Sequence, residues 1–249
     1  MNKVVTIHGG PGAAGEMKPV SDELRKDFEV LEPHQTAMSV SGQVEELKQQ
    51  LEKDGMSQSI LIGYSWGAWL GWILASKYPT LVKKMILVSA GPFEEKYASE
   101  IMKTRLKRLN DDDTREIISI GKRFSNHSDK EKNEMFTRFG QLMTKADSYK
   151  PLPDNTKIDF SYGIYSRVWP EAEGFRNSGK LLKMGTRITY PIIAIHGDID
   201  PHPFIGVKEP LEAILNDFKT ILLKNCGHKP WIEREAREEF YKVLRREIR

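Results

Sequence analysis

A serine flanked by glycines is the feature of this chain whose residue types and spacing point most directly to chemistry. Ser65 lies in the sequence Gly-Tyr-Ser-Trp-Gly, between Gly63 and Gly67. The apolar run 59–62 before it is typical of a strand, and the apolar run 68–75 after it is typical of a buried helix. In this setting G-x-S-x-G predicts a nucleophile elbow, a tight turn that exposes the hydroxyl beside the positive end of a helix dipole. Ser65 is therefore the candidate nucleophile for acyl transfer.

A glycine-rich loop near the start of the chain could supply the hydrogen-bond donors that acyl transfer needs. Residues 8–12 have the sequence HGGPG and follow the strand-like run 3–7. The tetrahedral intermediate carries a negative oxygen, which backbone N–H groups of such a loop can stabilise. We expect the N–H groups of Gly10 and Trp66 to form this oxyanion hole, and His8 to fix the loop structurally. An ordinary strand-end turn is the alternative interpretation.

An acid and a histidine further along the chain complete the set of candidate catalytic residues. Asp198 and Asp200 follow the apolar run 191–195, and His228 follows the strand-like run 218–223. The chain order serine, aspartate, histidine is the order found in hydrolases with a nucleophile elbow. All candidates fall at the carboxyl ends of predicted strands, where such sheets bind ligands. We expect the histidine to remove the serine proton while an aspartate holds the imidazole in the required tautomer.

These motifs together resemble the α/β-hydrolases, and HGGPG with G-x-S-W-G most resembles the proline iminopeptidase branch. The resemblance implies Gly10 and Trp66 as the oxyanion donors. It implies Asp200 rather than Asp198 as the acid, because residues 197–200 match the G-x-x-D pattern of that family. The G-H-x-P pattern at 227–230 likewise implies His228 as the base. The resemblance covers both ends of the chain and does not extend to its middle.

Strand-like and helical runs alternate outside the middle of the chain. Runs 28–31 and 84–88 add two strands, and an apolar stripe predicts a helix that ends at Gly55. This alternation predicts an α/β protein with a mostly parallel sheet covered by helices on both faces. Because the glycine-rich loop begins only a few residues into the chain, the sheet is expected to lack the first two strands of a full α/β-hydrolase sheet.

The middle of the chain changes to consecutive helical patterns. We predict a helical cap over residues 93–185, inserted into a core formed by 1–92 and 186–249. Ser128 and Glu131 have the spacing of a capping box, and the acids 111–113 are predicted to cap the helix that precedes them. An insertion after the sixth strand of a full sheet would lie over the serine. A helical subdomain with no binding role is the alternative.

The cap and the small core favour a small-molecule substrate over a folded protein. In iminopeptidases, cap carboxylates hold the free amine of the substrate, and Glu171 and Glu173 beside Trp169 are the candidate counterparts here. Exposed acids at a helix start are an equally good interpretation of the two glutamates. A carboxylesterase without peptidase activity therefore stays open. So does a non-catalytic ligand receptor on a hydrolase scaffold.

The composition limits which other classes of protein this chain can belong to. The 249 residues carry a net charge of +3, too small to indicate nucleic-acid binding, and no apolar run is long enough to span a bilayer. With a single cysteine, Cys226, no internal disulfide can form, which together with the lack of a signal-peptide pattern favours a cytoplasmic protein. No cofactor is expected and the oligomeric state is left open. A last set of residues alternates along the chain as metal ligands can, namely His196, Asp198, Asp200 and His202. A serine nucleophile needs no metal, so we expect no metal site there.

Overall fold

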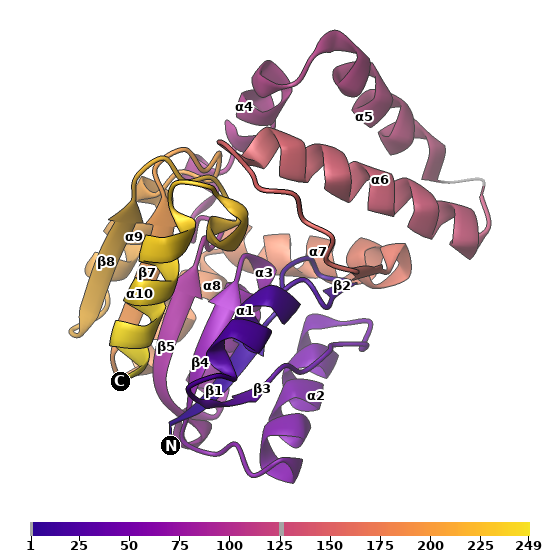
Figure 1. Ribbon diagram of the computed structural model, residues 1–249. Helices are drawn as coiled ribbons and strands as arrows, with labels where there is room; N and C mark the ends of the chain where they lie inside the picture. Colours follow the sequence, from indigo (N-terminus) through magenta and orange to yellow (C-terminus); the bar gives the residue numbers. More distant parts are fainter. Residues whose placement is uncertain (1, 125–126) are drawn as a thin grey trace.

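The computed structural model describes residues 2–124 and 127–249, which form a central sheet between two groups of helices (Figure 1). The sheet has six strands in the order β3-β1-β4-β5-β7-β8, and every neighbouring pair is parallel. This confirms the predicted α/β class with a mostly parallel sheet. The strands are β1 (Lys3–Ile7), β3 (Glu29–Leu31), β4 (Ser59–Tyr64), β5 (Val82–Val88), β7 (Ile192–Gly197) and β8 (Phe218–Leu223).

The strand order creates a switch point between β1 and β4. From β1 the chain passes to β3 on one side, and from β3 it crosses to β4 on the other. The loops that follow β1 and β4 therefore leave the sheet side by side, at the place where open α/β sheets bind ligands. One of these loops is the glycine-rich segment 8–12, and the other contains Ser65.

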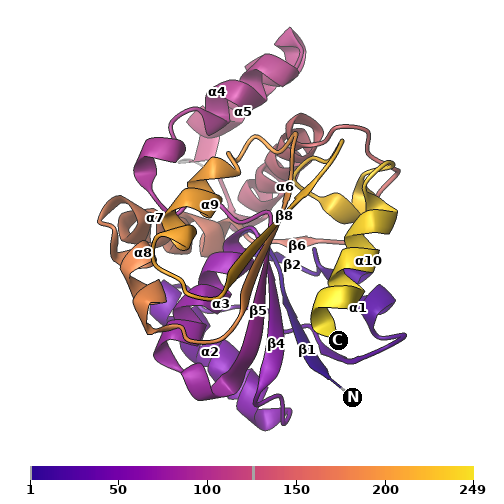
Figure 2. The same cartoon turned by 90° about the vertical axis from the view of Figure 1, so that its left-hand side faces the viewer.

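Alternate residues of the strands enter two hydrophobic cores, one on each face of the sheet. Val5 and Leu61 lie in one core, whereas Val4 and Ile60 lie in the other. Figure 2 shows the covering helices on opposite sides of the strands. The first core is covered by α2 (Val40–Lys53), α3 (Trp66–Lys77), α8 (Lys180–Met184) and α9 (Ile205–Glu212), and the second by α1 (Lys18–Leu24) and α10 (Arg237–Ile248).

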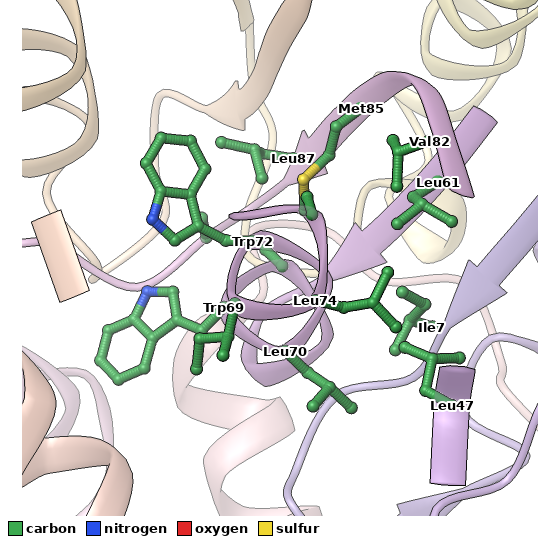
Figure 3. Packing of buried hydrophobic residues seen from close by; sticks show 14 of the residues in the cluster. Ile7, Leu47, Leu61, Trp69, Leu70, Trp72, Leu74, Val82, Met85 and Leu87 are labelled. Atoms are coloured by element: carbon green, nitrogen blue, oxygen red, sulfur yellow. The ribbon is translucent and has the colours of Figure 1, made fainter. Parts of the chain in front are cut away.

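Helix α3 carries Ser65 at its start and is buried over most of its surface (Figure 3). A Cβ atom on Gly71 would lie 2.8 Å from Met85 Cε and 3.1 Å from Ile7 Cδ1, so the missing side chain lets the helix approach the sheet closely. The ring nitrogen of Trp72 donates to the carbonyl of Leu181 at 2.9 Å. Because the helix is packed on several sides, the serine at its first turn has a rigid support.

The chain between β5 and β7 forms the helical insertion. Figure 1 shows α4, α5 and α6 beyond the carboxyl ends of the strands, whereas α8 packs against α3 of the core. A short antiparallel pair links β6 of the insertion to β2 of the glycine-rich loop region. Besides α8, the insertion contains α4 (Ile101–Arg108), α5 (Asp111–Arg123), α6 (Asp129–Asp147), β6 (Asp159–Phe160) and α7 (Tyr162–Asn177). Strand β2 is Ala13–Ala14.

Local capping signals in the insertion were predicted with mixed success. The capping box of Ser128 and Glu131 at the start of α6 is confirmed. The prediction that the acids 111–113 cap the preceding helix is wrong, because they form the first turn of α5 and Asn110 is its N-cap. Acids favour the positive end of the following helix over the negative end of the preceding one.

Candidate active site

Ser65 lies in a strained turn at the N-terminus of α3. Its backbone has φ 51° and ψ −115°, in the positive-φ region that residues with a side chain rarely adopt. A Cβ atom on Gly63 would lie 2.3 Å from the carbonyl oxygen of Gly67, and one on Gly67 would lie 2.2 Å from that of Ile7. Only glycine therefore fits on either side of the turn, which is the local geometry that the G-x-S-x-G spacing predicts.

The glycine-rich loop lies beside this turn. Gly10 has φ +104° and lines the same cavity as Ser65 and Trp66. Neither the Gly10 N–H nor the Trp66 N–H donates to a protein acceptor within residues 2–124 and 127–249. His8 is fully buried, and its Nδ1 donates to the Gly9 carbonyl at 2.7 Å. These positions are compatible with the predicted oxyanion donors, and His8 has the structural contacts expected of it.

Asp200 and His228 meet in a buried hydrogen bond. The distance from Oδ2 of Asp200 to Nδ1 of His228 is 2.7 Å, and the Asp200 side chain is fully shielded from solvent. Asp198 points elsewhere, since its Oδ1 accepts the N–H of Cys226 at 3.2 Å. The geometry therefore favours Asp200 over Asp198 as the partner of the histidine.

The Asp200 carboxylate stays ionised although it is buried. Burial by itself would raise its pKa, but the surrounding His228, His196 and His202 oppose this effect, and the pKa lies well below the ordinary range. A carboxylate at this place can hold the Nδ1 proton of His228 and stabilise a charged imidazole. Nε2 of His228 is then the nitrogen available for proton transfer.

The loop that carries His228 is held by residues from outside the core sheet. The His228 N–H donates to the main-chain carbonyl of Asp147, at the end of α6, at 2.9 Å. The fully buried carboxylate of Glu233 accepts the N–H groups of Gly227, Tyr149 and Lys150 at 3.0, 2.8 and 2.8 Å. The helical insertion therefore contacts the histidine loop directly.

A cavity of about 320 Å³ lies between the sheet and the insertion. Ser65 and His228 both line it, together with aromatic side chains of the insertion such as Phe136 and Tyr165. Within residues 2–124 and 127–249 no hydrogen bond joins the Ser65 hydroxyl to His228, whose Nδ1 binds Asp200. In enzymes without substrate such contacts are often long and tighten only in the complex.

The three predicted substrate contacts separate into two groups. Trp169 and Glu173 line the cavity, and Trp169 stacks on Trp69 with ring centroids 5.8 Å apart. Glu171 faces away from it, because its carboxylate accepts the N–H of Val40 at 2.8 Å and caps α2. The N-terminus of α2 is a favourable place for this negative charge. The structure therefore leaves Glu173 as the candidate amine partner and gives Glu171 a structural role.

The alternating residues that resemble metal ligands do not converge on one point. Asp198 is turned towards Cys226, whereas Asp200 and His202 bind each other. In the described residues a different group, Asp147 with His202 and His228, has ligand atoms within 4.8 Å of one another. Both carboxylate oxygens of Asp147 already accept from Arg105, at 2.7 and 2.6 Å. A guanidinium at this distance repels a cation, so this group is poorly suited to a metal ion.

Sequence reasoning missed several residues around the site. The sequence marks His202 only as a possible metal ligand, and neither Arg105 nor Glu233 lies in a motif. Their partners are distant in sequence, for example Arg105 with Asp147 and Glu233 with Tyr149. No spacing rule connects residues that meet only through tertiary packing. A histidine two positions after the acid was the one local signal that could have pointed to His202.

Comparison with known proteins identifies the class. A family described as the alpha/beta hydrolase fold matches residues 3–235, and the chain belongs to this family. Epoxide hydrolase 4 of Mus musculus is 31% identical over 75 residues, and this match covers 30% of the present chain and only 21% of that protein.

Solved structures share the architecture over nearly the whole chain. VinJ has a TM-score of 0.70 at 17% identity, over 99% of this chain and 90% of its own. Est816, described as an N-acyl homoserine lactone degrading enzyme, has a TM-score of 0.64 at 15% identity, over 98% and 92%. E-2-(Acetamidomethylene)succinate hydrolase has a TM-score of 0.62 at 16% identity, over 98% and 90%. Identities this low establish a common fold and leave the chemistry to the site itself.

Among the described residues, no helix has the length and apolarity needed to cross a membrane.

Proposed function

We propose that this protein is a serine hydrolase that cleaves a small-molecule ester or amide through an acyl-enzyme. The observation that carries the proposal is the buried hydrogen bond of 2.7 Å between Asp200 and His228, beside a cavity that Ser65 also lines. An ionised, buried aspartate on Nδ1 of a cavity histidine is the arrangement that prepares Nε2 to act as a base. The strained turn at Ser65 supplies a nucleophile at a helix N-terminus.

The proposed reaction has two halves. Oγ of Ser65 attacks the substrate carbonyl carbon as its proton passes to Nε2 of His228, and the N–H groups of Gly10 and Trp66 stabilise the oxyanion. The intermediate collapses when His228 returns this proton to the leaving alcohol or amine. Water then attacks the acyl-enzyme with His228 as base, which releases the acid and restores the serine.

Replacement of the serine tests the whole proposal. We expect Ser65→Ala to lower turnover of a reactive aryl ester by at least about 10³-fold and to abolish labelling by a fluorophosphonate, because the nucleophile is removed. Ser76→Ala, a buried serine on the same helix, is the matched control and should keep both signals. Full activity of the Ser65→Ala protein would contradict the mechanism. A wild-type protein that resists the probe and hydrolyses no ester or amide would favour a ligand receptor.

The motif resemblance supports a finer proposal, an iminopeptidase-like preference for amides with a free N-terminal amine. Glu173 lies 3.3 Å from the guanidinium of Arg176 and is partly exposed, so a substrate ammonium could reach it. We expect Glu173→Gln to raise KM for a proline arylamide about tenfold, because a charge-assisted contact is lost, and to leave a short-chain aryl ester unaffected. Glu171→Gln is the control, since Glu171 caps α2 outside the cavity. If the wild type cleaves only the ester, the protein is a plain carboxylesterase.

A further inference from the structure

Asp200 is held by a second histidine besides His228. The main-chain N–H and the ring Nδ1 of His202 both lie 2.9 Å from Oδ1 of Asp200, while Nδ1 of His228 lies 2.7 Å from Oδ2. The two imidazole rings stack with centroids 4.2 Å apart and planes inclined by 25°. His202 therefore binds Oδ1 and His228 binds Oδ2, with Nε2 of His196 at 3.4 Å from Oδ2 as well, so rotation of the carboxylate would break bonds on both sides.

Arg105, on α4 of the insertion, fixes the tautomer of His202. Its Nη2 lies 3.4 Å from Nε2 of His202. Because a guanidinium can only donate, Nε2 accepts, and the ring proton of a neutral His202 is on Nδ1, facing Asp200. Burial lowers the pKa of His202 to about 4, and nearby His228 acts in the same direction. The ring is therefore neutral at neutral pH and adds a hydrogen bond to the carboxylate without adding a charge.

His196 fixes the backbone at the same position. Its Nε2 lies 2.8 Å from the main-chain oxygen of His202, and since a carbonyl only accepts, His196 donates. Both the side chain and the main chain of residue 202 are thus anchored. A donor on a rigid backbone holds its acceptor more accurately than one on a free loop.

We propose that His202 is a positioning residue, which orients the Asp200 carboxylate towards His228 and links its orientation to the helical insertion through Arg105. The inference rests on the proposed function, because it assigns a role behind the Ser65, His228 and Asp200 triad. The same arginine pairs with Asp147, whose carbonyl accepts the His228 N–H. Arg105 therefore contacts both His202, which binds the Asp200 carboxylate, and Asp147, which supports the loop of His228.

Three substitutions at one position test this role. Asn can place an amide donor near the location of Nδ1, Gln can place polar atoms only near Nε2, and Leu offers neither. For an ester substrate we expect His202→Leu and His202→Gln to lower kcat about ten- to a hundredfold with KM within about threefold, by analogy with the loss when the hydrogen-bond partners of metal-binding histidines are removed. The rate of fluorophosphonate labelling should fall in parallel. His202→Asn should recover most of both, whereas His34→Asn, at an exposed histidine, should match the wild type.

The outcomes separate this inference from the proposed function. If Ser65→Ala is inactive but His202→Gln keeps kcat within about twofold of the wild type, the triad stands and the role of His202 is overturned. Equal losses in the Asn, Gln and Leu variants, accompanied by equal falls in melting temperature, would show that His202 only stabilises the fold and would also overturn it. If the Leu variant does not fold, the comparison of Asn with Gln still decides, because both are polar and close in size to histidine.

Discussion

Asp198 and Asp200 are separated by one residue, and only one of them can be the acid of the proposed triad. Both carboxylate oxygens of Asp200 face histidine nitrogens, whereas Asp198 accepts from Cys226 and lies 3.8 Å from Lys224. We expect Asp200→Asn to lower kcat about 10⁴-fold, because an amide no longer fixes the histidine tautomer, as with the triad aspartate of serine proteases. Steady-state hydrolysis of an aryl ester measures this loss.

Asp198→Asn is the matched control for that substitution. It keeps an oxygen that can accept the Cys226 N–H, and we expect its kcat to stay within about twofold of the wild type. The reverse pattern, a large loss with Asp198→Asn and none with Asp200→Asn, would move the acid to the other aspartate. In the sequence, only the G-x-x-D pattern of the family resemblance favours Asp200, and the spacing of the residues does not decide between the two aspartates.

At the scale of elements, the helical insertion helps to build the site as well as to cover it. Its β6 pairs with β2, and the N–H of Ser161 donates to the carbonyl of Gly12 at 2.9 Å, so the glycine-rich loop is tied to it. The carbonyl of Asp147 and the carboxylate of Glu233 tie the histidine loop to it in the same way. Both loops that flank Ser65 therefore depend on segments that fold as part of the insertion.

The core elements could be predicted from the sequence, but these ties could not. The apolar runs 59–62 and 191–195 correspond to β4 and β7, which are buried at every position, and the predicted and observed bounds of β8 coincide at 218–223. Such signals are local, because burial on both faces of a parallel sheet demands continuous apolar residues. Glu171 shows the opposite case. Its position at a helix start was clear, but its partner Val40 lies 131 positions away and determines which way the carboxylate points.

At the scale of the whole molecule, two buried neutral histidines and a third that is largely shielded from solvent should make the fold sensitive to mild acid. Burial is the main cause that lowers the pKa values of His8, His196 and His202 from 6.5, in the last case to about 4. In the unfolded chain these rings take up protons as the pH falls below about 6.5, while the folded protein does not. The unfolded state then binds more protons, so stability is complete above this pH and is lost progressively towards pH 4.

The expected loss in the free energy of unfolding at mildly acidic pH is large enough to measure. Each of the three histidines contributes at most about 1.4 kcal/mol per pH unit within its window, so urea unfolding at about pH 7.5 and about pH 5 should show a clear fall in the free energy of unfolding. Asp200 and the other carboxylates with lowered pKa add to the loss only at lower pH, because their unfolded values lie near 4. His202→Asn should reduce the slope, since it removes one of the three titrating rings, whereas His34→Asn at an exposed site serves as the control. A free energy of unfolding that stays constant over this range would mean that the buried rings are charged in the folded protein. That result would remove the basis for a neutral His202 donating to Asp200.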